Sequence, residues 1–162
     1  MNRSHLTVLL AVLVAGANSH AEDPQASSSM PAGYRDWKLI SVAHEEGSLN
    51  DIRAILGNDA ATKAFRTGSL SFPDGAIIAR LAWRYVPSEE NNKAFGRVQS
   101  FVAGSPTNVQ FMIKDTKRYA ATGGWQFVQF DDAKPADKDA KVCFACHVPV
   151  QDRDFVFTRY SP

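Results

Sequence analysis

The sequence predicts a single domain of the α+β class, built mainly on an antiparallel β-sheet with a few short helices. Runs rich in aromatic and β-branched residues, such as 76–86 and 125–130, recur along the chain. Turn signals made of Gly, Pro and Asp separate these runs, and the segments with helical character are short. The chain has 162 residues, a length that suits one domain.

The first 21 residues predict a secretory signal peptide. A short basic start with Arg3 precedes an apolar run over 6–14, and small residues at 19 and 21 form a cleavage site. The apolar run is short for a membrane span, although a membrane anchor is the alternative interpretation. Cleavage after Ala21 would leave 162 minus 21, or 141 residues. We therefore expect an exported, periplasmic protein.

Charge gives no indication of a polyanionic partner. Cleavage after Ala21 removes Arg3 from the 18 basic residues and none of the 17 acidic ones, so 17 of each remain. A chain so balanced has no electrostatic basis for binding nucleic acid or a membrane surface. Residues 22–33 are rich in Ser, Pro and Ala and predict a flexible leader, which leaves 34–162 as the folded domain.

The first half of the domain predicts a short helix or turn, two strands and a helix. The expected elements are a turn at 34–37, strands at 38–43 and 52–56, and a helix over 60–65. Asn58 or Asp59 is suited to cap that helix, and Gly68 is suited to stop it. Pro73-Asp74-Gly75 is a turn signal before the strongest strand, 76–86.

The second half predicts a polar loop at 89–93 and then mostly strands. The expected elements are strands at 97–103 and 108–113 joined by Gly104-Ser105-Pro106, a helical or turn segment at 114–121, a strand at 125–130, a polar connector at 133–139, a helix at 141–147 ended by Pro149, and a last strand at 155–157.

The string Cys143-Phe144-Ala145-Cys146-His147 lies in the last of these helices. Two cysteines three positions apart, followed at once by histidine, are the attachment signature of a c-type haem. Each thiol can add to one haem vinyl group, and the histidine is then held beneath the iron as an axial ligand. The sequence therefore predicts one covalent haem, attached through Cys143 and Cys146, with His147 as the iron ligand.

Other uses of this motif are a disulfide, a redox dithiol or half of a zinc site. A redox dithiol would be expected early in the chain beside a βαβ pattern. Zinc would need further Cys or His ligands at suitable spacing, and the other histidines are His5, His20 and His44. The export signal agrees with haem, because covalent haem attachment takes place outside the bacterial cytoplasm.

Three markers in order resemble a known family. They are Phe72-Pro73-Asp74-Gly75 leading into a strand, Lys114-Asp115-Thr116-Lys117-Arg118-Tyr119 followed by Gly123-Gly124-Trp125, and the haem motif followed by Asp154-Phe155-Val156-Phe157-Thr158-Arg159-Tyr160. Together they resemble the cytochrome P-460 family, which includes the β-sheet cytochromes c′ (cytochrome c′-beta), over residues 34–162.

This resemblance implies a homodimer with one covalent haem per chain, ligated by His147 and open on the opposite face. The family holds two functional types. Cytochromes P-460 oxidise hydroxylamine and carry a lysine crosslink to the haem, whereas the β-type cytochromes c′ lack it and bind gases such as NO and CO.

Two positions favour the gas-binding branch. The crosslinking lysine falls on Arg80, and a guanidinium stays protonated and is a poor nucleophile. The distal carboxylate falls on Gln110, which can hydrogen-bond but cannot accept a proton at neutral pH. Arg80 could instead pair with a haem propionate or point away from the haem.

Further residues are candidates for the distal pocket by the same resemblance. Arg53 matches a distal arginine, which could stabilise a bound anion, and its alternative role is a solvated strand charge. Leu49 matches a distal aromatic position. Phe72 and Phe127 are apolar candidates that would exclude water, and each could equally be ordinary core.

A sixth iron ligand would make a low-spin electron carrier instead. The candidates are His44, Met30 and Met112. We expect Met30 in the leader, Met112 in the core and His44 on the surface. The leading hypothesis is thus a five-coordinate haem protein that binds NO or CO in gas binding, sensing or detoxification. The alternatives are a hydroxylamine oxidoreductase and an electron-transfer cytochrome with a redox partner protein.

Overall fold

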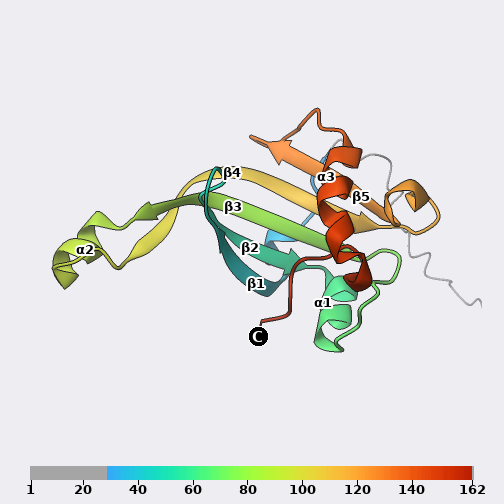
Figure 1. The fold of residues 1–162 in the computed structure, drawn as a ribbon, viewed down its shortest axis with the longest axis horizontal. Helices are drawn as coiled ribbons and strands as arrows, with labels where there is room; N and C mark the ends of the chain where they lie inside the picture. Colours follow the sequence, from blue (N-terminus) through green and yellow to red (C-terminus); the bar gives the residue numbers. More distant parts are fainter. Residues whose placement is uncertain (1–28, 162) are drawn as a thin grey trace, which may run out of the picture.

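The computed structural model describes residues 29–161, which form a six-stranded antiparallel sheet with three short α-helices (Figure 1). Each strand pairs with the next one along the chain, in the order β1-β2-β3-β4-β5-β6. The strands are β1 Lys38–Glu45, β2 Asp51–Gly57, β3 Ile77–Pro87, β4 Phe101–Lys114, β5 Trp125–Asp131 and β6 Lys134–Pro135. The predicted α+β class is therefore confirmed.

The α-helices are short, and each is preceded by a residue whose side chain caps its first turn. They are α1 Asp59–Arg66, α2 Glu89–Phe95 and α3 Ala140–His147, with 3₁₀ turns η1 Tyr34–Asp36, η2 Ala120–Thr122 and η3 Val148–Arg153. Asn58 Oδ1 accepts a hydrogen bond from Ala61 N at 3.0 Å, and Asp139 Oδ1 accepts one from Lys141 N at 2.9 Å. Such side-chain caps satisfy amide groups that have no partner within the helix.

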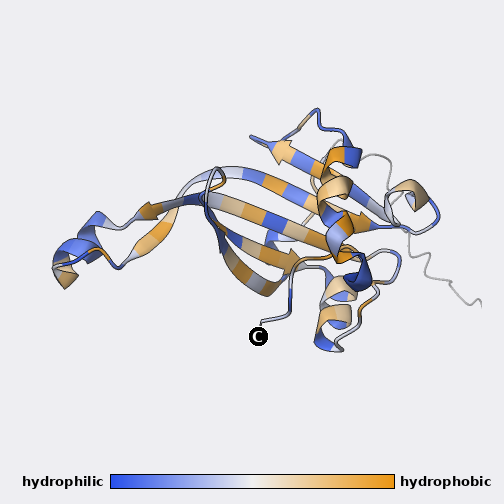
Figure 2. Cartoon of the chain, viewed as in Figure 1, coloured by the Kyte–Doolittle hydropathy of each residue, from blue (hydrophilic) through white to orange (hydrophobic). Residues whose placement is uncertain are grey.

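Each face of the sheet carries a cluster of buried apolar residues. Apolar and polar residues alternate along the strands (Figure 2). On one face, Tyr34 and Trp37 pack edge-on against Phe111, with ring centroids 5.3 and 6.5 Å apart. On the other face, α1 and the segment after α3 enclose a core that includes Phe72 and Trp125. Helix α3 crosses this second face above β5 (Figure 1).

The prediction of a polar loop at 89–93 is wrong, because these residues belong to the helix α2. Ser88 Oγ accepts a hydrogen bond from Asn91 N, and Gly96 ends the helix with a φ of 67°. A positive φ at that position suits glycine. The segment has no apolar periodicity, so only its two caps could have indicated a helix.

The prediction of two strands at 97–103 and 108–113 is also wrong, because residues 101–114 form one continuous strand, β4, and residues 97–100 precede it without strand structure. Gly104-Ser105-Pro106 makes an irregularity in the pairing with β3, where Trp83 faces Pro106, and not a turn. Proline has no amide hydrogen to give to a ladder and is tolerated at a bulge. The chain reverses at α2 instead.

The predicted last strand at 155–157 is absent from the described part of the chain. Asp154 and Phe155 have φ angles of 52° and 64°, which are incompatible with extended backbone. Their amides bond back to η3, to Gln151 O and Val150 O. The polar connector predicted at 133–139 contains the short strand β6, which pairs with β5.

The predicted signal peptide 1–21 and most of the leader 22–33 lie outside the described residues. Among residues 29–161, no helix has the length and apolar character needed to cross a bilayer.

Candidate cofactor-binding cavity

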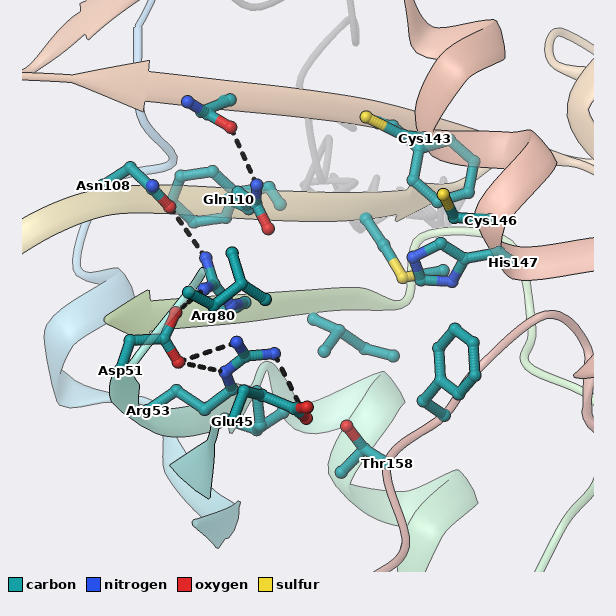
Figure 3. A pocket seen from close by; sticks show the side chains of 18 of the residues that line it. Glu45, Asp51, Arg53, Arg80, Asn108, Gln110, Cys143, Cys146, His147 and Thr158 are labelled. Carbon is teal, nitrogen blue, oxygen red and sulfur yellow. Dashed lines mark hydrogen bonds and ion pairs between the residues drawn. The ribbon is translucent and has the colours of Figure 1, made fainter. Parts of the chain in front are cut away.

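A cavity of about 1170 Å³ lies between the sheet and α3 (Figure 3). Its walls come from inward-facing residues of β1 to β5, from α3 and from the segment 156–159. Pockets for small molecules usually measure about 300–1,000 Å³. The cavity is therefore large enough for a bulky planar group.

Helix α3 brings Cys143, Cys146 and His147 to one wall of the cavity (Figure 3). The two cysteines are free thiols and not a disulfide. Positions i and i+3 share a helix face, which is why both thiols line the cavity. Burial raises the pKa of the Cys143 thiol, while the nearby Lys138 charge opposes this shift more weakly.

The imidazole of His147 is held by the backbone that follows η3. Its Nδ1 lies 2.6 Å from the carbonyl oxygen of Phe155. A carbonyl can only accept, so Nδ1 carries the proton and Nε2 keeps its lone pair. Burial lowers the pKa of His147, with a smaller opposing effect from the Phe155 carbonyl. The ring is thus neutral and suited to bind a metal through Nε2.

A group of charged residues, which we call the arginine cluster, lies across the cavity from α3 (Figure 3). It consists of Asp51, Arg53 and Arg80, with Glu45 at its edge. Asp51 Oδ2 lies 2.5 Å from Arg80 Nη2, and Asp51 Oδ1 accepts from Arg53 Nε at 2.8 Å. Arg53 also pairs with Glu45 at 3.5 Å. Both oxygens of Asp51 therefore hold a guanidinium.

Strand register explains this cluster. Asp51 and Arg53 are two positions apart in β2 and so point to the same face of the sheet. Arg80 on β3 lies opposite Ile55 and projects to that face too. Desolvation lowers the pKa of Arg80, and the Arg53 charge adds to this effect while Asp51 opposes it. Arg80 is further fixed by Asn108, whose Oδ1 accepts from Nη1 at 2.7 Å.

Gln110 also faces the cavity and forms a chain of amides. Its Nε2 donates to Gln129 Oε1 at 2.8 Å, and Lys138 Nζ donates to the same oxygen at 3.1 Å. Gln129 in turn donates to Asp131 at 2.7 Å. The Gln110 side chain is thereby oriented with its own carbonyl oxygen left for another donor.

The structure places most of the predicted pocket residues on the cavity, with two differences. Leu49, Arg53, Arg80 and Gln110 line it. Phe127 lines it too, but on the side of His147, with ring centroids 4.9 Å apart.

Phe72 does not line the cavity. Its ring packs in the core, 4.9 Å from Phe65 and 5.5 Å from Trp125. Met112 lines the cavity. His44 stacks on Tyr85 at 3.8 Å and Met30 packs against the opposite face of the sheet, so neither reaches the cavity.

Sequence reasoning missed Asp51, Asn108 and Gln129. The alternation of Asp51 with Arg53 along a strand could have indicated Asp51. Asn108 and Gln129 could not be assigned without the register, because they meet Arg80 and Gln110 only through pairing with neighbouring strands.

The residues present fit a covalently held haem. Two free thiols and a neutral imidazole stand on one wall. Apolar side chains of the sheet, including Ile78, Met112 and Phe127, line part of the cavity. This donor set matches the needs of a c-type haem: two nucleophilic sulfurs and one nitrogen ligand. Within residues 29–161, no three His, Cys, Asp or Glu side chains are grouped as ligands for a bare metal ion.

The sequence matches the model of a known protein family. The family model described as Cytochrome P460 matches residues 31–158. No curated protein matches the sequence significantly.

Proposed function

Because this chain belongs to the cytochrome P460 family, we propose that it is a c-type haem protein of the cytochrome c′-beta branch, binding NO or CO on the open side of its iron. Membership of the family implies a haem cofactor. The observation that supports the finer proposal is the state of Arg80, which the resemblance aligns with the crosslinking lysine and which is held by Asp51 and Asn108.

The proximal side of the proposed site consists of Cys143, Cys146 and His147. The thiols would attach the haem, and Nε2 of His147 would bind its iron, with Nδ1 fixed by Phe155 O. When bound, haem supplies an iron with a free coordination position for a small ligand. The chain's own residues then determine which molecules reach that position.

The arginine cluster and Gln110 support ligand binding over hydroxylamine oxidation. A guanidinium cannot serve as the nucleophile of a crosslink, and both arms of Arg80 are already hydrogen-bonded. Gln110 can orient a bound ligand by a hydrogen bond but cannot take its proton. If the positions correspond as the resemblance implies, the residues of the enzymatic branch are replaced here by groups that can bind a ligand but do not react with it.

One observation favours the alternative of a hydroxylamine oxidoreductase. Asp51 is a carboxylate on the cavity wall and could take the place of the missing distal acid. Its two oxygens already accept from Arg53 and Arg80, however, which limits that role. An electron-transfer cytochrome is the other alternative, and Met112 is the cavity residue that could supply a sixth ligand.

Absorption spectroscopy of the dithionite-reduced protein tests the proposal. We expect a broad high-spin spectrum with an ordinary Soret band, which sharpens when CO is added. We also expect trypsin to cleave normally after Arg80, since that side chain carries no crosslink. The Met112→Leu variant, which removes the only thioether lining the cavity among the described residues, should give the same spectra.

Other outcomes would select the alternatives. A strongly red-shifted Soret band together with loss of cleavage at Arg80 would contradict the gas-binding proposal and favour a crosslinked haem. Sharp low-spin bands that become high-spin in Met112→Leu would instead identify an electron carrier with a Met112 ligand.

We propose further that two copies associate through an arm formed by the ends of β3 and β4 and by α2, which extends from the sheet (Figure 1). α2 has no buried residue. Phe95, Val98, Phe101 and Val102 are exposed on the arm, at 57, 72, 39 and 41 %. A two-stranded ribbon is marginally stable alone, so we expect a second copy to cover it.

The double variant Phe95→Asp/Val98→Asp is expected to convert the dimer into a monomer, because two charges would be placed in an apolar contact. Sedimentation velocity measures the change. Leu70→Asp is the matched control, since Leu70 is 61 % exposed but lies in the loop after α1. A monomeric wild-type protein, or a dimer that survives the double substitution, would contradict the proposal.

We also propose that residues 1–21 direct export to the periplasm. The basic start, the apolar run over 6–14 and the small residues before Glu22 support this. The intact mass of the exported protein should correspond to a chain that begins at Glu22, and a retained N-terminus would argue for an anchor.

A further inference from the structure

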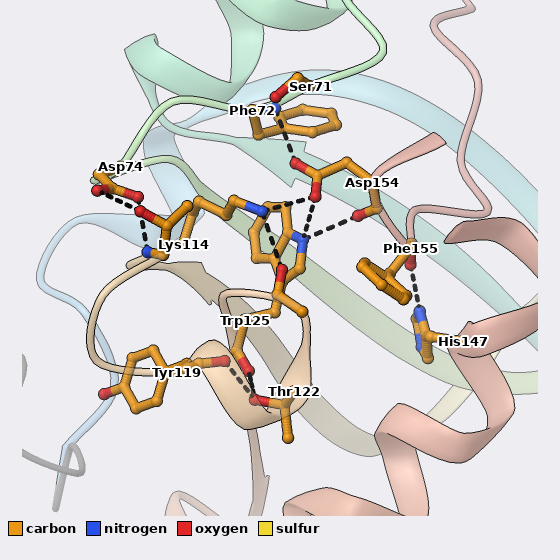
Figure 4. Close-up of polar contacts among 12 residues, drawn as sticks. Ser71, Phe72, Asp74, Lys114, Tyr119, Thr122, Trp125, His147, Asp154 and Phe155 are labelled. Atoms are coloured by element: carbon orange, nitrogen blue, oxygen red, sulfur yellow. Dashed lines mark hydrogen bonds and ion pairs between the residues drawn. The ribbon is translucent and has the colours of Figure 1, made fainter. Parts of the chain in front are cut away.

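A buried ion pair lies behind His147, outside the cavity (Figure 4). Lys114 ends β4 and Asp154 follows η3, and their side chains are only 4 and 11 % exposed. Lys114 Nζ lies 2.6 Å from Asp154 Oδ1 and donates to Gly123 O at 3.1 Å. It also lies 4.9 Å from the centroid of the Trp125 ring. The ammonium therefore has partners on several sides although it is removed from water.

Asp154 is held from further directions. Its Oδ2 accepts from the amide of Phe72 at 2.8 Å. Its backbone carbonyl accepts from Trp125 Nε1 at 2.8 Å. Three separate segments of the chain, those of Lys114, Phe72 and Trp125, thus fix one residue. Such a set of contacts defines both the side chain and the backbone of Asp154.

The backbone at Asp154 and Phe155 adopts a conformation that residues other than glycine rarely adopt. Asp154 and Phe155 both have positive φ angles, 52° and 64°. Aspartate visits this left-handed region with modest cost, but a phenylalanine there is rare. Strained residues persist only where the surroundings determine them. The Phe155 ring lies directly beneath Gly123, where an added Cβ would come within 2.3 Å of it.

The strained turn at Asp154 and Phe155 contacts the predicted iron ligand, His147. The carbonyl of Phe155 is the acceptor for Nδ1 of His147, at 2.6 Å (Figure 4). In metal sites, a hydrogen bond from the second nitrogen of a histidine fixes the ring and increases the basicity of the ligating nitrogen. Lys114 is thus connected to His147 through Asp154 and the adjoining peptide, without touching His147.

We propose that the Lys114–Asp154 ion pair is a positioning device for His147, holding the turn at Asp154 and Phe155 so that the Phe155 carbonyl receives the Nδ1 hydrogen. This inference rests on the proposed role of His147 as the haem iron ligand. It assigns a role to two residues that the cavity itself does not contain.

Resonance Raman spectroscopy of the dithionite-reduced haem protein tests this. The Lys114→Met/Asp154→Asn double variant removes both charges together, which leaves no buried charge without a partner and favours folding. Asparagine also tolerates the left-handed conformation, so the backbone is not forced to change. The iron–histidine stretching band is expected to shift to lower wavenumber, because a weaker hydrogen bond makes Nε2 less basic.

A second readout is the exchange of the His147 Nδ1 proton with solvent, followed by NMR in the same protein. It should become about tenfold faster or more in the double variant, since local opening exposes the proton. Lys117→Met is the matched control: it makes the same substitution three residues away, at an exposed position. Neither readout should change in that control.

The two proposals fail in different ways. A wild-type protein without an iron–histidine band would contradict the role of His147 in the proposed function. A wild-type band that is present and stays unchanged in a folded double variant, with unchanged proton exchange, would overturn only the positioning role. If the double variant does not fold, the Lys114→Arg variant, which keeps both charges but changes the geometry of the donor, decides by the same two readouts.

Discussion

Replacing Cys143 and Cys146 together by serine is expected to abolish covalent attachment of haem to the chain. Both thiols line the cavity from α3, and the described residues contain no other cysteine. A hydroxyl is a far weaker nucleophile than a thiolate and does not form the corresponding bond to a vinyl group. The intact mass should fall by one haem, and acidified acetone should extract any haem that remains bound.

The two single variants are the controls. Cys143→Ser and Cys146→Ser each keep one thiol, so each should retain haem through a single thioether and resist extraction. A double variant that keeps its haem mass would show that the group is attached elsewhere, and Arg80 would then be the first position to map.

Asp51→Asn is expected to lower the free energy of unfolding by about 3 kcal/mol or more, as found when one partner of a buried ion pair is removed. Arg53 and Arg80 are 14 and 15 % exposed and both pair with Asp51. Without the carboxylate, two guanidinium groups would face each other in the cavity wall. Urea unfolding of the haem-loaded protein measures the change.

Asp59→Asn is the matched control for that substitution. The Asp59 side chain is 97 % exposed and pairs with Lys38 at 3.4 Å. Exposed pairs contribute about 0–1 kcal/mol, so little change is expected. If Asp51→Asn were no more destabilising than Asp59→Asn, the arginine cluster could not depend on its carboxylate.

The features that sequence reasoning predicted well are those determined by neighbouring residues. The helix that carries Cys143, Cys146 and His147 and the cap at Asn58 depend on spacing over a few positions. The strand at 76–86 also depends on local composition and matches β3 to within a residue. Such patterns are legible without a structure because their physical causes are local.

The features that were missed depend on pairing between distant segments. Asp51 joins Arg80 only through the register of β2 with β3. Phe72 and Phe127 are chemically alike, yet the fold buries the first in the core and sets the second against His147. β4 was divided in two at Pro106, because a proline in a strand resembles a turn unless the bulge opposite it is known.

The position of Lys114 and Asp154 illustrates the same limit. Both residues lie in strings that mark the family resemblance, but nothing in their local sequence indicates that they meet. Their pairing joins segments 40 positions apart. The two residues meet only because the chain folds into the turn that places Phe155 beneath Gly123.

The simple strand order has a consequence for the sequence of events in folding. Every pairing from β1 to β6 joins strands that are consecutive in the chain, so the sheet assembles by short-range closures, which favour fast folding. α3 follows the whole sheet. The sheet can therefore form before α3 docks on it. A chain that does not acquire its cofactor is expected to keep a folded sheet and not to be unfolded.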